Sequence, residues 1–349
     1  MGLASCGNKQ EQSACQPCNE CICNKEEEFV FQSWNDCASL NNLKSLVTKV
    51  TKKGSETYVD PADRVAVFDM DGTLYAELDP TYLEYAMFMH RCFDDPTYTA
   101  PAEVMAVAEE IKEGSWTHTY KSGMDLRHAN AAAKAYSGMT LKEFADYTKE
   151  FIKKDAPGFS GMTYADAFYK PMIEVVDYLH KNDFKCYVVS GSDRYLCRAL
   201  CCDALKIPSE RVIGMDVRLK GTEQGEKDGL DYTLGTEDSL VRTDELLIKN
   251  LKMNKVTAIA KEIGRQPIVS FGNSGGDTAM ARYAVYNNPN PSGAWMLVAD
   301  DNVRDHANLE KAESSRKNWE KEGFNIVSMK NDFRTIYGDS VQRTEFVID

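Results

Sequence analysis

The sequence has no long apolar run and no surplus of positive charge. It contains no stretch of about 18 or more apolar residues, the length that a membrane-spanning helix requires. Acidic residues outnumber basic ones by 54 to 41, which gives a formal net charge of −13, and the lysines form no basic stripe. These absences argue against a membrane-spanning helix in this chain. They also argue against nucleic acid or an anionic membrane surface as a partner.

Histidine is scarce as well, and none lies in the segment that is richest in cysteine. Six of the 11 cysteines fall in the first 37 residues: Cys6, Cys15, Cys18, Cys21, Cys23 and Cys37. Their spacing fits no standard zinc finger, so disulfides in an oxidising compartment are the favoured alternative to a metal or iron–sulfur site. Residues 1–28 are polar and lack apolar periodicity, which predicts a disordered, cysteine-rich tether.

The first residues also resemble a lipid-attachment motif. Leu3-Ala4-Ser5-Cys6 is similar to the bacterial lipobox, in which the cysteine is lipidated after signal cleavage. We therefore expect a lipid anchor at Cys6 and a location in the cell envelope, periplasmic or at the surface. A basic start and an apolar run of about 7–15 residues would then be encoded upstream. The alternative is a cytoplasmic protein.

Two aspartates follow a short apolar segment early in the chain. Val65–Leu74 reads VAVFDMDGTL, which predicts a strand buried on both faces and ending near Asp69. With one residue between them, Asp69 and Asp71 would point to the same side, and Gly72 would let the chain turn away. Paired oxygen ligands at a strand end suit Mg²⁺. The alternative is an ordinary Asp-Gly turn with incidental charges.

Three further segments supply groups of the same kind. Cys186–Gly191, CYVVSG, predicts a strand that ends in Ser-Gly before a helix, which is a phosphate-binding geometry. Asn254–Gly264 has helical periodicity and carries Lys255 at its start. Pro267–Phe271 predicts a third strand, which runs into the glycine-rich loop Gly272–Asp277, GNSGGD.

These four segments, in this order, resemble the motifs of the haloacid dehalogenase superfamily of aspartate-nucleophile phosphotransferases. The similarity is greatest to its phosphoserine-phosphatase-like branch and spans about residues 63–334. DMDGT matches the first motif, VVSGS the second, Lys255 the third and GNSGGD the fourth. The acid at Asp71 favours phosphatase or phosphomutase chemistry over dehalogenation.

The resemblance implies a role for each matched residue. Asp69 would be the nucleophile that forms an aspartyl-phosphate, and Asp71 the general acid and then the general base. Lys255, with Lys252 as the alternative, would place a positive charge on the phosphoryl oxygens. Those oxygens would also be held by Thr73, Ser190 and the N–H groups of Gly72 and Gly191. Mg²⁺ would be held by Asp69, the backbone carbonyl of Asp71 and a group of the fourth motif, Asn273 or Asp277.

One position departs from the family pattern. The fourth motif of phosphoserine phosphatases normally has an aspartate where this chain has Asn273. An amide oxygen can bind Mg²⁺ without supplying charge, so we expect weaker metal binding unless Asp277 approaches more closely. This departure shifts the expected substrate away from phosphoserine.

The expected fold is a three-layer α/β, Rossmann-like parallel sheet core with an inserted α-helical cap domain. Residues 29–74 and 170–349 would form the core, and residues 75–169 the cap. Pro101–Glu113 and the Thr140–Glu143 capping box predict cap helices. Candidate substrate contacts in the cap are Glu77, Trp116, Tyr120 and Arg127, with ordinary surface charges and cap core as the alternative.

The remaining segments predict further parts of the core. Ala294–Ala299 and Asn325–Lys330 predict strands, with a charged helix over Asn308–Glu322 between them. Asp300, after the first of these strands, would line the site rim or cap a helix. Lys220–Asp238 predicts a hairpin or an exposed loop.

The expected function is a Mg²⁺-dependent phosphatase that hydrolyses a small phosphorylated metabolite through an aspartyl-phosphate. The alternatives are a phosphomutase or phosphotransferase, and an envelope-bound binding lipoprotein with weakened catalysis. No residue pattern specifies the substrate or the oligomeric state.

Overall fold

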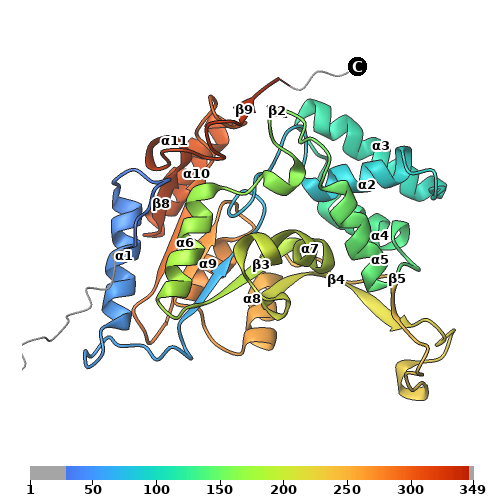
Figure 1. Cartoon of the computed structure of the whole chain (residues 1–349), viewed down its shortest axis with the longest axis horizontal. Helices are drawn as coiled ribbons and strands as arrows, with labels where there is room; N and C mark the ends of the chain where they lie inside the picture. Colours follow the sequence, from blue (N-terminus) through green and yellow to red (C-terminus); the bar gives the residue numbers. More distant parts are fainter. Residues whose placement is uncertain (1–28, 346–349) are drawn as a thin grey trace, which may run out of the picture. The chain divides into compact units, whose positions relative to one another are not determined.

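A seven-stranded sheet forms the centre of the fold (Figure 1). The computed structural model describes residues 29–345, so the predicted tether at residues 1–28 and the expected anchor at Cys6 lie outside the described residues. The strand order is β5-β4-β3-β1-β6-β7-β8, and every neighbouring pair is parallel except β4 with β5. The strands are β1 Val65–Phe68, β3 Lys185–Asp193, β4 Val212–Gly221, β5 Leu240–Ile248, β6 Val269–Gly272, β7 Gly293–Val298 and β8 Asn325–Ser328.

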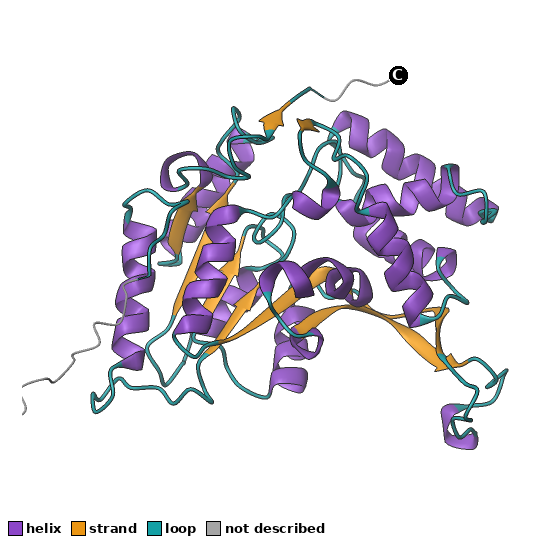
Figure 2. Ribbon diagram, in the orientation of Figure 1, coloured by secondary structure: helices purple, strands orange, loops and turns teal. Residues whose placement is uncertain are grey.

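Strand β1 lies in the middle of the sheet and is buried on both faces. Val65 and Val67 belong to the apolar cluster that includes residues of α8 and α9, whereas Ala66 and Phe68 belong to the cluster on the opposite face. Alternating side chains point to opposite faces of a sheet, so an apolar residue at every position requires a helical layer on each side. Figure 2 shows these two helical layers. The predicted three-layer α/β fold is confirmed.

Helices on one face are α1 Ala38–Thr51, α6 Lys170–Lys181 and α7 Arg194–Leu205. On the other face lie α8 Met253–Ala258, α9 Thr278–Val285 and α10 Leu309–Lys321. Helix α8 continues as a π-helical turn over Ile259–Ile263 and ends at Gly264, whose φ of 69° is the left-handed value that favours glycine. The helix predicted over Asn254–Gly264 is therefore present, with a wider last turn.

Four helices follow the first motif, in the segment predicted as the cap. They are α2 Leu83–Phe93, α3 Ala102–Thr117, α4 Met124–Ala135 and α5 Leu141–Phe151, and they are joined to the core again by the short helix Tyr164–Asp166. The capping box predicted at Thr140 and Glu143 is present at the start of α5. Helices α2, α3 and α4 contact one another, while α5 contacts α7 of the core. These contacts hold the helical segment beside the strand ends.

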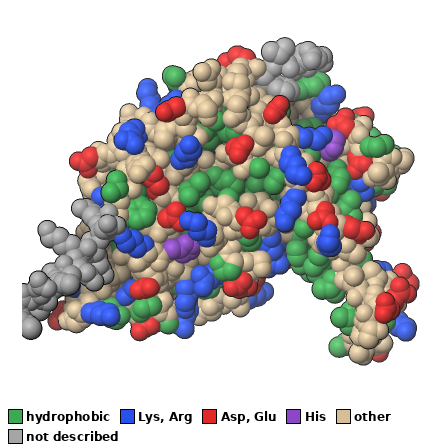
Figure 3. Space-filling view, in the orientation of Figure 1, with side chains coloured by type: hydrophobic (Ala, Val, Ile, Leu, Met, Phe, Trp, Pro, Cys, Tyr) green, Lys and Arg blue, Asp and Glu red, His purple; other side chains and the backbone are tan. Residues whose placement is uncertain are grey.

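Strands β4 and β5 form a hairpin that reaches the helical segment (Figure 1). The segment predicted as a hairpin or exposed loop, Lys220–Asp238, is the end of this hairpin. Four leucines of the hairpin and its end are exposed: Leu230, Leu234, Leu240 and Leu247. Figure 3 shows apolar side chains along this arm. Strand β5 also contacts α4, and it bridges to Thr140 through Val241. The hairpin thus links the sheet to the helical segment.

The remaining predicted elements lie close to their expected bounds. Strands β7 and β8 match the segments predicted at residues 294–299 and 325–330, and Asn308 caps α10 with its side chain. Strand β8 is followed by the short helix α11 Met329–Asp332, and β2 Phe159–Ser160 pairs with β9 Gln342–Arg343. In the part of the chain that the structure describes, no helix is long and apolar enough to cross a membrane.

Candidate active site

Asp69 is held at the carboxyl end of β1, between the ends of β3 and β6. Its N–H donates to the carbonyl of Phe271 at 3.0 Å, which extends the pairing of β1 with β6 by one residue. Because β3 and β6 are the direct neighbours of β1, the first, second and fourth motifs meet at one edge of the sheet. Ligands bind outside this edge in open α/β sheets.

Lys255 joins two carboxylates at this edge. Its Nζ donates to Asp69 Oδ1 at 2.5 Å and to Asp277 Oδ1 at 2.7 Å, and its side chain is 1% exposed. Lys252, the alternative from the sequence, is exposed. The helical start of α8 therefore brings Lys255, and not Lys252, into the site.

Burial dominates the electrostatics of this group. Burial raises the pKa of Asp69, and the charge of Asp277 raises it further, whereas Lys255 opposes both effects. Burial alone would lower the pKa of Lys255, but the charges of Asp277 and Asp69 outweigh it, so the net shift is upward. Lys255 therefore stays protonated and keeps a fixed positive charge beside Asp69.

Asp71 has one satisfied oxygen and one free oxygen. Oδ2 accepts a hydrogen bond from Ser192 Oγ at 2.8 Å, while Oδ1 is buried and has no hydrogen-bond partner among residues 29–345. Burial raises the pKa of Asp71 to about 7, with contributions from Glu84 and Glu77, although the Ser192 hydrogen bond opposes the rise. A carboxyl group with a pKa near neutrality can both donate and accept a proton at neutral pH, as a general acid–base requires.

The groups predicted to bind a phosphoryl group differ in whether they already have hydrogen-bond partners in the structure. Thr73 and Ser190 are fully buried; Thr73 Oγ1 lies 3.4 Å from Asn273 Oδ1, and Ser190 Oγ accepts from the N–H of Ser192 at 3.0 Å. The N–H of Gly72 donates to the carbonyl of Tyr75 at 2.6 Å. In this structure the Gly72 N–H closes its own turn, so it is not free for a phosphoryl oxygen as the sequence had suggested.

Gly191 of β3 lies close to Leu251. A Cβ at Gly191 would lie 2.5 Å from a methyl group of Leu251, so a larger residue here would require the leucine side chain to move. The neighbouring carbonyl of Ser190 accepts from Asn250 Nδ2 at 3.0 Å. The second-motif loop is therefore packed directly against the segment that leads into α8.

The fourth motif contributes Asn273 and Asp277 in different ways. Asp277 Oδ2 accepts from the N–H groups of Asn273 and Ser274 and from Ser274 Oγ, and its Oδ1 accepts from Lys255. Both oxygens of Asp277 thus orient the loop and the lysine. The side chain of Asn273 instead contacts Thr73 and Glu77.

The first and fourth motifs contain oxygen donors of the kind that Mg²⁺ prefers. In the described part of the chain, no group of three or more His, Cys, Asp or Glu side chains could hold a metal ion by itself. A mixed set fits better: an Asp69 oxygen, the main-chain carbonyl of Asp71 and the amide oxygen of Asn273. Asp69 Oδ2 accepts no hydrogen bond within residues 29–345, so it is free to serve as a ligand. These hard oxygen donors would fit Mg²⁺.

Several charged residues that hold the second motif were not found from the sequence. Glu84 of α2 accepts from the N–H of Asp193 at 2.8 Å, and Lys249 lies 3.4 Å from its other oxygen. Arg242 of β5 donates to both oxygens of Asp193 and lies 4.0 Å from the ring of Phe144. The helical segment and the hairpin therefore both hold the end of β3, which carries Ser192. Apolar periodicity gives no signal for such isolated buried charges.

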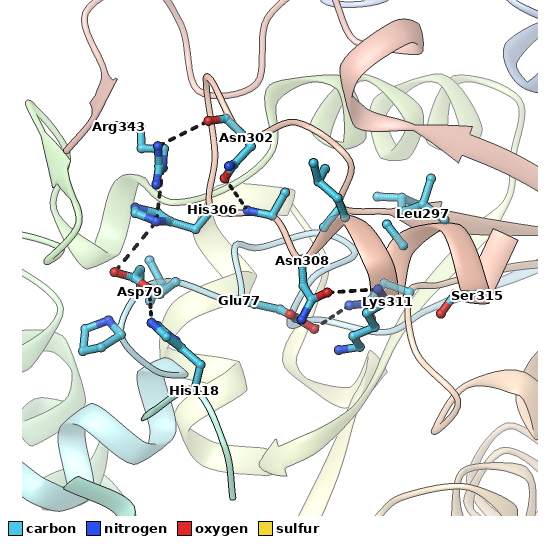
Figure 4. A pocket seen from close by; sticks show the side chains of 18 of the residues that line it. Glu77, Asp79, His118, Leu297, Asn302, His306, Asn308, Lys311, Ser315 and Arg343 are labelled. Carbon is cyan, nitrogen blue, oxygen red and sulfur yellow. Dashed lines mark hydrogen bonds and ion pairs between the residues drawn. The ribbon is translucent and has the colours of Figure 1, made fainter. Parts of the chain in front are cut away.

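A cavity of about 650 Å³ opens beside the fourth motif (Figure 4). Glu77 and Asn273 line it where it meets the site, and Trp116 lines it from α3. Figure 4 also shows Asp79 between two histidines, each 3.8 Å from a carboxylate oxygen: His118 and His306.

The other candidates from the sequence have structural contacts elsewhere. Arg127 pairs with Glu110 at 2.7 Å, and Tyr120 OH contacts Thr81 Oγ1 at 2.5 Å. Asp300 accepts from Ser328 and Arg316, and from the N–H of Lys330 in α11. Of the candidates outside the four motifs, Glu77 is the one that touches a motif residue directly.

Comparisons with known proteins agree with this geometry. The profile of the haloacid dehalogenase-like hydrolase family matches residues 66–282, a region that holds all four motifs. Among curated proteins, a 1-deoxy-D-xylulose 5-phosphate reductoisomerase of Clostridium perfringens is 27% identical over 119 residues. That match spans 34% of this chain and 29% of the curated relative.

Two solved structures are similar at low sequence identity. A conserved protein of unknown function from Anaerococcus prevotii is 17% identical, with a TM-score of 0.50, over 86% of this chain and 95% of its own. A phosphoserine phosphohydrolase-like protein from Francisella tularensis is 12% identical, with a TM-score of 0.40, over 76% of this chain and 94% of its own. The similarity to the Anaerococcus prevotii protein supports the fold. The similarity to the Francisella tularensis protein is too low to support it further. Because the family profile matches more than half of the chain and includes every motif, this chain belongs to the haloacid dehalogenase-like hydrolase family.

Proposed function

We propose that this hydrolase is a Mg²⁺-dependent phosphatase that acts on a small phosphomonoester. The observation that carries the proposal is the pair of acids after β1. Asp69 is paired with a fixed cation, Lys255, and Asp71 has a free oxygen and a pKa near neutrality. Phosphoryl transfer needs a nucleophile, a positive charge beside it and a proton donor for the leaving oxygen.

The chemistry would proceed in two balanced steps. In the first, an Asp69 oxygen attacks phosphorus, the bond from phosphorus to the leaving oxygen breaks, and Asp71 gives its proton to that oxygen. In the second, Asp71 takes a proton from water, the water oxygen attacks phosphorus, and the bond to Asp69 breaks. Phosphate leaves, and both acids return to their starting states.

The surrounding groups would bind and orient the phosphoryl group. Lys255 would neutralise charge on its oxygens, and the buried hydroxyls of Thr73 and Ser190 would donate to them. Mg²⁺, held by Asp69, the Asp71 carbonyl and Asn273, would supply further positive charge at the phosphoryl oxygens. The helical segment and the hairpin would exclude water from the site.

A phosphate-release screen tests this function. Phosphoserine, phosphorylcholine, phosphoethanolamine and sugar phosphates would be offered with Mg²⁺ or with EDTA, to the wild type and to Asp69→Asn. We expect release from at least one substrate, dependent on Mg²⁺ and lost in the variant. If Asp69→Asn kept more than about a tenth of the wild-type rate, the covalent mechanism would be wrong. Transfer to an added alcohol rather than to water would indicate a phosphotransferase. Tight binding without turnover would favour the binding-protein alternative.

We also propose that the chain is anchored to the cell envelope through Cys6, with residues 7–28 as a spacer. The support is the Leu-Ala-Ser-Cys sequence and the polar, cysteine-rich segment after it. Sequencing the upstream DNA and fractionating cells that express the full gene would test this. The expected result is an upstream apolar segment and a membrane-bound protein that a Cys6→Ser variant releases. A wild-type protein found wholly in the cytosol would overturn the proposal.

A further inference from the structure

Asn273, the residue that departs from the family pattern, is fixed on three sides. Its Nδ2 donates to Glu77 Oε1 at 2.8 Å, and its Oδ1 lies 3.4 Å from Thr73 Oγ1. Its main-chain N–H donates to Asp277 Oδ2 at 3.2 Å. A loop residue held by three different partners presents one defined face to the site.

Glu77 determines whether the nitrogen or the oxygen of the Asn273 amide faces the site. A carboxylate accepts hydrogen bonds but cannot donate them, so the nitrogen of Asn273 must face Glu77. The amide oxygen then points away from Glu77, toward Thr73 of the first motif. The opposite orientation would place two acceptor oxygens, that of Asn273 and that of Glu77, against each other. Glu77 therefore orients Asn273 as an oxygen ligand.

The contact between these residues is built into the first motif. Gly72 has a φ of 76°, and a Cβ there would lie 1.9 Å from Asn273 Nδ2 and 3.0 Å from Glu77 Cγ. Glycine at this position leaves room for the amide and the carboxylate to meet. Gly72 thus allows the chain to reverse direction and also leaves space for the contact between Glu77 and Asn273.

Glu77 also places a negative charge where the fourth motif has lost one. An aspartate at position 273 would bring a charge, whereas Asn273 brings none, and Glu77 lies one hydrogen bond away. Glu77 Oε1 lies 2.8 Å from Asn273 Nδ2, so an acidic side chain lies directly beside the position where the family pattern has an aspartate.

We propose that Glu77 and Asn273 together replace the missing aspartate as one cation-binding unit. Asn273 supplies the oxygen that touches a hard divalent cation, and Glu77 orients that oxygen and supplies the negative charge through the amide. Glu77 is a positioning residue in this scheme. The inference rests on the proposed Mg²⁺-dependent function but concerns metal binding itself, which can be measured without substrate.

The competing role for Glu77 is contact with the substrate, because it also lines the 650 Å³ cavity. The two roles can be distinguished by measuring KM and the affinity for Mg²⁺. A residue that contacts only the substrate changes KM and leaves the affinity for Mg²⁺ unchanged, whereas a residue that supports the metal changes that affinity with no substrate present. Partners of metal ligands typically change metal affinity about 10- to 100-fold when they are removed.

The test is a calorimetric titration of Mg²⁺ into five proteins: the wild type, Glu77→Gln, Asn273→Asp, the double variant and a control. Glu77→Gln keeps the shape and an acceptor oxygen for Asn273 but removes the charge. The double variant reverses the native pair, since the new amide at position 77 can donate to the new carboxylate at position 273. Glu345→Gln is the control, because Glu345 is an exposed acid at the same cavity whose hydrogen bond is with Arg343.

We expect Glu77→Gln to bind Mg²⁺ at least about tenfold more weakly, and Asn273→Asp to bind it more tightly than the wild type. The double variant should recover at least wild-type affinity, and Glu345→Gln should match the wild type. Circular dichroism and thermal unfolding in EDTA would show that each variant is folded.

Wild-type-like affinity in Glu77→Gln would overturn the inference and leave the phosphatase proposal intact. Failure of the double variant to recover affinity, or an equal loss in Glu345→Gln, would also overturn it. A wild-type protein that binds no Mg²⁺ would overturn both this inference and the proposed metal dependence.

Discussion

Ser192 Oγ donates a 2.8 Å hydrogen bond to Asp71 Oδ2 and leaves Asp71 Oδ1 buried without a partner in the described part of the chain. A buried oxygen without a hydrogen-bond partner costs free energy, unless a polar group of the substrate or a water molecule forms a hydrogen bond with it during the reaction. The leaving-group oxygen of a phosphomonoester, and later a water molecule, would do so. In the proposed mechanism, Ser192 would thus fix which oxygen of Asp71 faces the reacting atoms.

The first prediction concerns this hydrogen bond. Ser192→Ala should lower kcat, because Asp71 loses its fixed orientation. The alkaline limb of the kcat/KM profile should move to higher pH, because the Ser192 hydrogen bond opposes the raised pKa of Asp71. Ser192→Thr, which keeps the hydroxyl, should restore most of both properties. An unchanged pH profile in the alanine variant would show that Ser192 does not act through Asp71.

The second prediction concerns Lys255. Lys255→Met leaves Asp69 and Asp277 buried and facing each other without a cation, so the variant should be less stable by about 3–5 kcal/mol as well as inactive. Lys252→Met is the matched control, because Lys252 is exposed at the start of the same helix and should change stability by less than about 0.5 kcal/mol. Urea unfolding in EDTA measures both. Equal effects of the two substitutions would contradict the assignment of Lys255.

The third prediction concerns pH and stability. The pKa of Asp71 is about 7 in the folded protein, above its value near 3.9 when unfolded. Between these values the folded state binds more protons than the unfolded state, so this group lowers stability as the pH rises, with the full loss present above about 7. Asp71→Asn cannot ionise and should therefore stabilise the protein more at pH 8 than at pH 5.

The size of this difference should be about 2.5–3 kcal/mol, because the pH rises by about two units before it passes the folded pKa, at about 1.4 kcal/mol per unit. Denaturant unfolding in EDTA at both pH values measures it. The same variant should lose about 10²- to 10⁴-fold in activity. A stabilisation that is equal at the two pH values would mean that Asp71 is already ionised at pH 5.

The fourth prediction concerns the clamp on the second motif. Arg242→Met removes both hydrogen bonds to Asp193 and leaves that carboxylate buried, so the variant should lose about 3–5 kcal/mol of stability. Arg218, on the neighbouring strand, is exposed and pairs with Glu245, so Arg218→Met should cost less than about 1 kcal/mol. Thermal unfolding of both variants checks this, and a small effect at Arg242 would contradict its role in holding the loop.

The residues that carry chemistry were predictable because they follow strand ends. Val65–Phe68 has an apolar residue at every position, which indicates a central strand and so fixes where Asp69 must lie. The same logic predicted strands that lead into the second and fourth motifs, and the structure shows these strands on either side of β1. Lys255 was preferred to Lys252 because of its place at the start of the helix before β6, and the structure brings Lys255 to Asp69.

The supporting charges were not predictable from the sequence. Glu84 lies 109 residues from its partner Asp193, and Arg242 lies 49 residues from it, so neither pair leaves a local pattern. Their burial depends on how the helical segment and the hairpin pack against the core. Turn geometry likewise decides whether a main-chain group such as the Gly72 N–H already has a hydrogen-bond partner. Residue types alone do not specify that geometry.

The most direct test of the central claim is detection of the phosphoryl group on Asp69. Asp71→Asn would be mixed with Mg²⁺ and an aryl phosphate, whose leaving group needs little help from a general acid. The first step then proceeds, while the second lacks its base, so the intermediate accumulates. After an acid quench, peptide mass spectrometry should find one phosphoryl group on the peptide that carries Asp69. A phosphoryl group on any other residue, or none on Asp69 while the wild type turns over, would contradict the account.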